Sequence, residues 1–185
     1  MVELVLGLLG TIGAGKDTAA DYLIKKYKFQ QIEMGDLVRD IAKSSGLSPT
    51  RLNLQRIQRQ YRSKYGSDYF INLTIRKIKG WKRAIINGIR TPTDAEVAKN
   101  HFGKKIKIVL IDADPRIRFS RLKKRHRAGF PNTHKEFLEH ERREWQLFDF
   151  KRTSQFTDYI VPNNGALSEL YKRLDALMVE LGAVG

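Results

Sequence analysis

The sequence predicts an α/β fold of three layers, in which helices cover a five-stranded parallel sheet. Five short apolar runs alternate with helical segments along the 185 residues, an order typical of a parallel, doubly wound sheet. The first run, residues 2–9, is almost continuously apolar, as expected for a strand buried on both faces. With 41% hydrophobic residues the chain can bury one core, so we expect a single domain over residues 1–185.

Each expected element has its own pattern. Strands are expected over residues 2–9, 29–33, 84–86, 106–111 and 157–161, and helices over 17–27, 93–102, from 114 onward, 133–150 and 167–181. Residues 36–79 are helical in pattern, with breaks near 46–49 and 66–67, where Ser48 and Ser67 are candidate N-caps. Two helical insertions are therefore expected, at about residues 36–80 and 115–152.

Composition narrows the classes of partner. The formal charge of +15 favours polyanions such as nucleoside polyphosphates or RNA, although a mixed charged surface is also an ordinary solvated one. The absence of cysteine excludes a disulfide framework and thiolate metal sites. The sequence shows no basic signal-peptide start and no apolar run of membrane-spanning length. We therefore expect a cytoplasmic protein with no membrane partner.

A glycine-rich string follows the first strand and precedes the first helix. It matches G-x-x-x-x-G-K in the context that a phosphate-binding loop requires. Glycines let successive N–H groups point at phosphate oxygens, the helix N-terminus adds partial positive charge, and the lysine supplies a mobile cation. The motif predicts a three-layer P-loop NTPase whose ATP-binding residues are Gly10, Thr11, Gly13, Ala14, Gly15, Lys16, Asp17 and Thr18.

The residue after Lys16 departs from the usual P-loop pattern. A Ser or Thr hydroxyl normally ligates Mg²⁺ at this position, but here Asp17 offers a hard carboxylate ligand instead. The third strand ends at Asn87, where many P-loop enzymes have an Asp. We hypothesise that the acidic metal ligand has moved from the strand end to the loop, as Asp17. The alternative is that Asp17 only stabilises the positive end of the first helix.

Three further segments carry charged residues suited to phosphate chemistry. M-G-D-L-V-R, residues 34–39, places Arg39 one helical turn beyond Asp36, so both can face one cleft. N-G-I-R-T-P, residues 87–92, places Arg90 at the carboxyl end of a parallel strand, where such sheets bind ligands. D-A-D-P, residues 112–115, is followed by a run of arginines that includes Arg118, Arg121, Arg125 and Arg127.

Together with the loop, these segments resemble the P-loop nucleoside monophosphate kinase superfamily over almost the whole chain. The chain is similar to adenylate kinases and dephospho-CoA kinases, and most similar to dephospho-CoA-kinase-like proteins of archaea. The resemblance implies an acceptor-binding insertion at about residues 36–80 and a lid region at about 115–152. It implies that Arg39 and Arg90 grip the acceptor, that Asp36 lies at the acceptor as a base, and that Arg121 and Arg125 close over the transferring phosphate. The catalytic set is thus Lys16, Asp36, Arg121 and Arg125.

Plainer structural interpretations stand beside these roles. Asp36 can be an N-cap, and Arg90 can pair with Asp94 in a turn. Arg118 is expected on a solvated basic helix. A later segment, residues 137–144, resembles the F-x-x-R-[DE]-x-x-E helix of the archaeal proteins, with His in place of the Arg. The aromatic and apolar residues that follow it, Trp145, Leu147 and Phe148, are expected in the core rather than as a base-stacking platform.

The sequence therefore predicts a phosphotransferase that depends on ATP and Mg²⁺. Because both acceptor arginines are present, the first-choice acceptor is a nucleoside or deoxynucleoside monophosphate. Dephospho-CoA is the second, supported by Asp36, and the Gly-Lys-Asp loop is also similar to that of phosphomevalonate kinases. The alternatives from other classes are an RNA-associated ATPase or assembly factor, supported by the charge of +15, and a nucleotide-binding module without catalysis.

Overall fold

Five parallel strands form the central sheet in the order β2-β3-β1-β4-β5. The structure, a computed structural model, describes residues 1–124, 131 and 133–183. The strands are β1 (Leu4–Leu9), β2 (Gln30–Glu33), β3 (Arg83–Asn87), β4 (Ile106–Asp112) and β5 (Tyr159–Pro162). β1 pairs in parallel with β3 on one side and β4 on the other, so the strand that leads into the phosphate loop is central. The predicted fold class is confirmed.

Helices connect the strands and cover both faces of the sheet. They are α1 (Lys16–Tyr27), α2 (Met34–Ser44), α3 (Arg51–Tyr65), α4 (Tyr69–Ile78), α5 (Pro92–Phe102), α6 (Pro115–Lys124), α7 (His134–Phe148), α8 (Phe150–Ser154) and α9 (Leu167–Glu180), with a 3-10 turn η1 (Gly103–Lys105). No helix in the described ranges is both long and apolar enough to cross a membrane.

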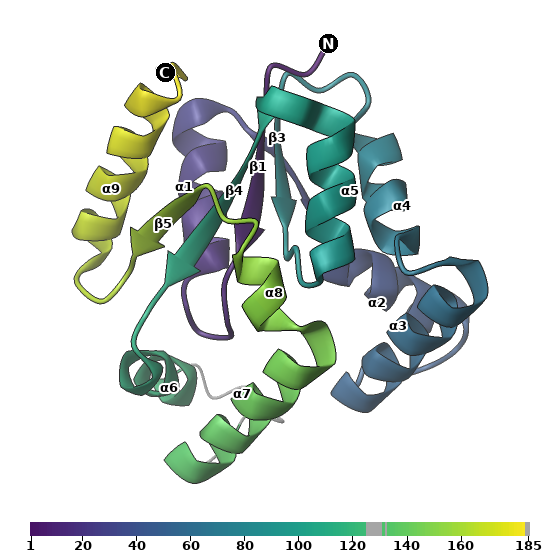
Figure 1. The fold of residues 1–185 in the computed structure, drawn as a ribbon. Coiled ribbons are helices and arrows are strands. Elements are labelled where there is room, and N and C mark those ends of the chain that lie inside the picture. Colours follow the sequence, from purple (N-terminus) through teal and green to yellow (C-terminus); the bar gives the residue numbers. More distant parts are fainter. Residues whose placement is uncertain (125–130, 132, 184–185) are drawn as a thin grey trace.

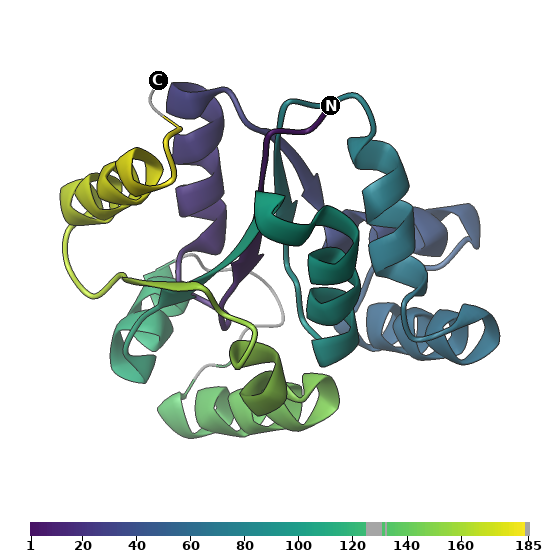
Figure 2. The same cartoon turned by 45° about the horizontal axis from the view of Figure 1, so that its top comes forward.

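The helices divide into three groups around the sheet. In Figure 1, α1 and α9 cover one face, α4 and α5 cover the other, and α6, α7 and α8 lie beyond the carboxyl ends of the strands. Two apolar clusters match the two faces: one includes Leu23 and Leu174, and the other includes Phe70 and Ile86. Figure 2 shows the N-terminus at the end of the molecule away from the green helices α7 and α8. The carboxyl ends of the strands are therefore the end that other elements enclose.

The helix starts in the first insertion lie later than the sequence predicts. Thr50 rather than Ser48 caps α3, and its side chain accepts a hydrogen bond from the Asn53 N–H at 3.3 Å. Asp68 rather than Ser67 is the N-cap of α4.

The helix predicted over 133–150 is two helices. Asp149 ends α7 with φ of 47°, in the left-handed region, and its side chain accepts a hydrogen bond from the Arg152 N–H that starts α8. Aspartate tolerates this conformation better than most residues because its short polar side chain bonds locally. The resulting turn lies near the carboxyl end of β3, where the Thr153 hydroxyl donates to the Arg90 carbonyl at 3.1 Å.

One carboxylate oxygen fastens α9 to α1. Oδ1 of Asp175 accepts hydrogen bonds from the Tyr22 and Tyr27 hydroxyls, both at 2.7 Å, and from Lys26 at 2.8 Å. Tyr22 also stacks on Tyr171 of α9 with ring centroids 4.0 Å apart. Burial would raise the pKa of Asp175, but the hydrogen bonds from Lys26, Tyr22 and Tyr27 outweigh it and lower that pKa below its usual range.

We expect Asp175→Asn to lower the free energy of unfolding by about 1 kcal/mol at pH 7, because an amide oxygen replaces a charged acceptor of three bonds. A carboxyl with a lowered folded-state pKa stabilises the fold above its unfolded pKa, and that stability is lost as pH falls through the folded value. The difference between wild type and variant should therefore shrink below about pH 4.

Urea unfolding at pH 7 and pH 3 measures this difference, with Asp40→Asn on the exposed side of α2 as the matched control. Equal stability of wild type and Asp175→Asn at pH 7 would contradict the assigned role.

Candidate active site

A cavity of about 300 Å³ opens at the carboxyl end of β1 and β3. Its walls come from four parts of the chain: the phosphate loop, the start of α2, the turn after β3, and the α7–α8 turn. The charged residues among those that line it are Lys16, Asp17, Glu33, Arg39, Arg90 and Glu144. Its aromatic lining is Trp145, Phe148 and Phe150. The volume suits a small-molecule ligand.

The phosphate loop has the backbone that its glycines predict. Gly13 and Gly15 have φ of 80° and 99°, which L side chains rarely adopt. A Cβ on Gly15 would lie 2.3 Å from Nδ2 of Asn163, so glycine is also required for space. Helix α1 begins at Lys16 without a side-chain cap, which leaves first-turn N–H groups for an anion. The loop therefore fits the polyphosphate of a nucleotide.

Asn163 supports the phosphate loop from behind. It is buried, its Nδ2 donates to the Ala14 carbonyl at 2.7 Å, and its backbone N–H donates to the Asp112 carbonyl at 2.6 Å. Its Oδ1 accepts from Arg121 at 3.5 Å. The residue thus ties the loop to the ends of β4 and β5. The sequence offered only the Asn-Asn-Gly turn after the last strand as a signal, and its role was not predicted.

Arg118 is a buried anchor, which corrects its expected place on a solvated helix face. Only 3% of it is exposed. Its guanidinium donates to the Ala113 carbonyl at 2.8 Å and to the Ile12 carbonyl in the phosphate loop at 3.3 Å, and it forms an ion pair with Glu141 of α7. It also lies over the Phe137 ring. Arg118 therefore fixes α7 relative to the loop.

Lys16 extends from the loop into the cavity. Burial lowers the pKa of Lys16; nearby Asp17 opposes the shift, and the charge of Arg90 adds to it. A polyphosphate in the cavity would offset both the burial and the repulsion from Arg90, because it would place negative charge between two cations.

Asp17 and Asn87 lie together, as the metal hypothesis requires. Nδ2 of Asn87 donates to Oδ1 of Asp17 at 3.0 Å, and Asn87 is 1% exposed. Within the described part of the chain, the buried Oδ1 of Asn87 has no hydrogen-bond partner, so it remains able to accept a hydrogen bond from a ligand or from metal-bound water. No group of three His, Cys, Asp or Glu in those residues could hold a metal by itself. The site therefore fits Mg²⁺ bound by Asp17 together with phosphate oxygens.

Arg39 lines the cavity from the start of α2, where two carboxylates hold it. Its Nη2 contacts Glu33 at 2.9 Å and its Nε contacts Asp36 at 2.8 Å. Burial would lower the pKa of Arg39, but the hydrogen bonds to Glu33 and Asp36 raise it. The Asp36 side chain is 60% exposed and is engaged with Arg39 rather than placed among the cavity-lining residues.

Arg90 lines the cavity, and its guanidinium lies 5.3 Å from the centre of the Phe148 ring. The alternative pairing with Asp94 is wrong. Asp94 is fully buried, caps α5 together with Thr91, and accepts two hydrogen bonds from Arg62 of α3 at 3.0 and 3.1 Å. Because Arg62 supplies the charge that Asp94 needs, Arg90 faces the cavity.

The expected core placement of the α7 aromatic segment is also wrong. Trp145 and Leu147 are 45% and 46% exposed, and Phe148 is only half-buried. Trp145 and Phe148 line the cavity, and Trp145 stacks on Phe150 at 5.2 Å with an interplanar angle of 22°. The position of α7 accounts for the difference, because this helix lies beyond the carboxyl ends of the strands (Figure 1) and its buried residues are Phe137 and Glu141.

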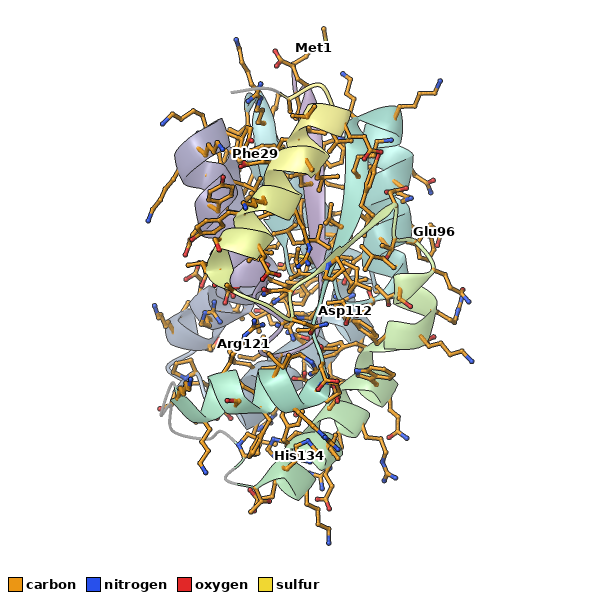
Figure 3. The ribbon with its side chains drawn as sticks, turned by 90° about the vertical axis from the view of Figure 1, so that its left-hand side faces the viewer. Met1, Phe29, Glu96, Asp112, Arg121 and His134 are labelled. Atoms are coloured by element: carbon orange, nitrogen blue, oxygen red, sulfur yellow. The ribbon has the colours of Figure 1, made fainter. Side chains whose placement is uncertain are left out.

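The predicted lid arginines divide between described and undescribed residues. Arg121, on α6, is half-buried against Asn163, and in Figure 3 it lies lower than Asp112, toward His134. Arg125 and Arg127 lie outside the described residues. Among the predicted ATP-binding residues, Gly10, Thr11, Gly13, Lys16 and Asp17 line the cavity, whereas Ala14 is buried beneath it.

Comparisons with known proteins agree with this geometry. Residues 9–138 match the family model described as an AAA domain. The chain is also 30% identical over 185 residues to a UPF0200 protein of Hyperthermus butylicus, covering 99% of this chain and 97% of that protein. The chain belongs to the AAA domain family and to the UPF0200 family. The predicted resemblance to P-loop kinases is thus supported by family as well as by fold.

Two solved structures share the fold of this UPF0200 chain. A shikimate kinase from Bacteroides thetaiotaomicron aligns with a TM-score of 0.61 at 14% identity, over 97% of this chain and 98% of that one. A gluconokinase from Sinorhizobium meliloti 1021 aligns with a TM-score of 0.62 at 14% identity, over 97% and 93%. These similarities show a P-loop kinase fold.

The close packing of Asn163 on Gly15 gives a test of the loop. Gly15→Ala should weaken nucleotide binding at least about tenfold, because the added Cβ displaces either the loop or Asn163. Gly80→Ala is the matched control: Gly80 has a similar φ of 94° but nothing within 4 Å of its added Cβ.

Both variants should lose about 1–2 kcal/mol of stability from left-handed strain, and only Gly15→Ala should lose affinity for a fluorescent ATP analogue. Equal affinities in the two variants would show that the Asn163 contact does not shape the loop.

Proposed function

We propose that the protein is an ATP-dependent phosphotransferase that moves the γ-phosphate of ATP to a small phosphorylated acceptor, a nucleoside or deoxynucleoside monophosphate. The observation that carries the proposal is the set of cations around one cavity: Lys16 from the phosphate loop, and Arg39 and Arg90 from the β2–β3 side. Two phosphorylated substrates that meet in one cavity need such positive charge from both sides.

The chain's own residues have distinct roles in this proposal. The loop N–H groups and Lys16 hold the ATP phosphates, and Arg39 and Arg90 hold the acceptor phosphate by bidentate contacts. Positioning and charge stabilisation then supply most of the catalysis, since phosphoryl transfer needs little covalent chemistry from the protein. The region of about residues 115–152, with Arg121, acts as a lid that excludes water, and that of about 36–80 forms the acceptor side.

Mg²⁺ has a place in the same scheme. When bound with the nucleotide, it would neutralise charge that develops on the transferring phosphate. Asp17 would hold it, and Asn87 would keep the Asp17 carboxylate oriented through its 3.0 Å hydrogen bond.

The engagement of Asp36 favours a phosphate acceptor over a hydroxyl acceptor. A hydroxyl, as in dephospho-CoA, calls for a nearby base, whereas a phosphate oxygen is already ionised and needs none. Asp36 bonds Arg39 and lies outside the cavity lining, so it orients that arginine more readily than it accepts a proton. The names of the two kinases that share the fold support the reaction class without indicating the acceptor.

An acceptor panel tests the proposal directly. ADP formation from ATP and Mg²⁺ should depend on a nucleoside monophosphate, and should fall about 10²- to 10³-fold in Lys16→Ala because a charge that stabilises the transition state is lost. Lys172→Ala, an exposed lysine on α9, should retain full activity.

The panel includes ribo- and deoxynucleoside monophosphates, dephospho-CoA, phosphomevalonate, RNA and no acceptor. Turnover that needs no acceptor and rises with RNA would replace the kinase proposal with that of an RNA-associated ATPase.

A charge-removing substitution tests the metal ligand. Asp17→Asn keeps an oxygen that can accept from Asn87 but removes the negative charge, so the Mg²⁺ concentration for half-maximal activity should rise about tenfold or more. Asp21→Asn, an exposed change on the same helix, is the control. A Mg²⁺ dependence in Asp17→Asn identical to that of wild type would refute the hypothesis that the ligand has moved to position 17.

A further inference from the structure

We propose that Trp145 and Phe148 form a stacking platform for the ring of the acceptor, so that this site selects acceptors that carry a planar aromatic base. The inference rests on the proposed function, since it concerns the acceptor of that reaction. It concerns a part of the chain, the α7–α8 turn, to which the sequence assigned only core packing.

The first observation is that a half-exposed tryptophan stands among the residues that line a charged cavity. Trp145 is 45% exposed although it lines the cavity, and Phe148 is half-buried beside it. One side of the Trp145 ring is already covered by Phe150, at 5.2 Å and 22°. The remaining exposed indole surface is apolar area that a flat ring can cover, and stacking is the arrangement that aromatic rings favour.

The second observation is the contact between this platform and an acceptor arginine. The Arg90 guanidinium lies over the Phe148 ring at 5.3 Å, so the group that would grip a phosphate and the aromatic ring are neighbours. A molecule that carries a phosphate and a planar base a few bonds apart can engage both at once. A purely aliphatic phosphate could engage only the arginine.

The third observation is that the platform is held in place rather than loosely attached. Glu141, one turn before Trp145 on α7, forms an ion pair with buried Arg118, which also bonds the phosphate loop. On the other side, the Thr153 hydroxyl of α8 donates to the Arg90 carbonyl. Both ends of the α7–α8 turn are therefore tied to elements of the cavity, so the platform is preorganised.

The position of the platform assigns it to the acceptor rather than to ATP. One of its two ties runs to Arg90, whose guanidinium also lies over Phe148, and Arg90 is at the end of β3, between β1 and β2 on the side of the sheet that carries Arg39. The opposite side of the phosphate loop is closed by Asn163 and Arg121, from beyond β4 and β5.

Tryptophan fluorescence and steady-state kinetics test the proposal together. The chain has two tryptophans, so Trp81→Phe leaves Trp145 as the sole indole emitter. Nucleoside monophosphates should quench this emission saturably, whereas ribose 5-phosphate and inorganic phosphate should not. In Trp145→Leu the acceptor KM should rise about 10- to 100-fold with the ATP KM unchanged, and Trp145→Phe should recover much of the loss.

Leu147→Ala is the matched control, because Leu147 is equally exposed on the same helix but does not line the cavity. An unchanged acceptor KM in Trp145→Leu, or a rise in the ATP KM instead, would overturn the platform while leaving the kinase proposal intact. Quenching by nucleoside monophosphates without any turnover would support the platform and reject the kinase. Neither quenching nor turnover with these nucleotides would reject both.

Discussion

The shape of the site depends on the contacts of one buried group, the guanidinium of Arg118. It joins three separate parts of the chain, because it bonds the carbonyls of Ile12 and Ala113 and pairs with Glu141. Removing one partner of a buried ion pair typically lowers the free energy of unfolding by about 3–5 kcal/mol, which is a large share of the stability of a domain. The phosphate loop, the end of β4 and α7 therefore hold one arrangement, and the cavity between them keeps its shape without a ligand.

Three cations of the described part of the chain line the cavity, and the fold balances the charge of each of them differently. Arg39 is balanced by Glu33 and Asp36, whereas Arg90 rests on an aromatic ring. Lys16 stays half-buried with a lowered pKa, because its surroundings favour loss of its charge. This unequal balance directs incoming negative charge toward Arg90, whose guanidinium lies over an aromatic ring, and it leaves Arg39 as a preoriented fork.

Local patterns predicted most of the fold and the centre of the site. The parallel five-stranded sheet, the phosphate loop and the placing of Arg39 and Arg90 follow from apolar runs, glycine spacing and the geometry of parallel sheets. What the sequence could not predict depends on contacts between distant segments. Arg118 and Asn163 take their roles from partners far along the chain, and Trp145 and Phe148 line the cavity because α7 lies beyond the carboxyl ends of the strands (Figure 1). The spacing of apolar residues along the sequence indicates neither contacts between distant segments nor where a helix lies relative to the sheet.

The buried ion pair between Arg62 and Asp94 restrains one side of the cavity. Asp94 caps α5 directly after the turn that carries Arg90, and Arg62 belongs to the helical insertion. Moving that insertion outward would leave the buried Asp94 carboxylate without its cation, so this side of the cavity resists movement. The turn between α7 and α8 is likewise tied at both ends, through Glu141 and Thr153. A cavity between two anchored segments selects ligands by their fit to a fixed shape, so a bulkier analogue would be rejected at entry instead of being accommodated by movement of the protein.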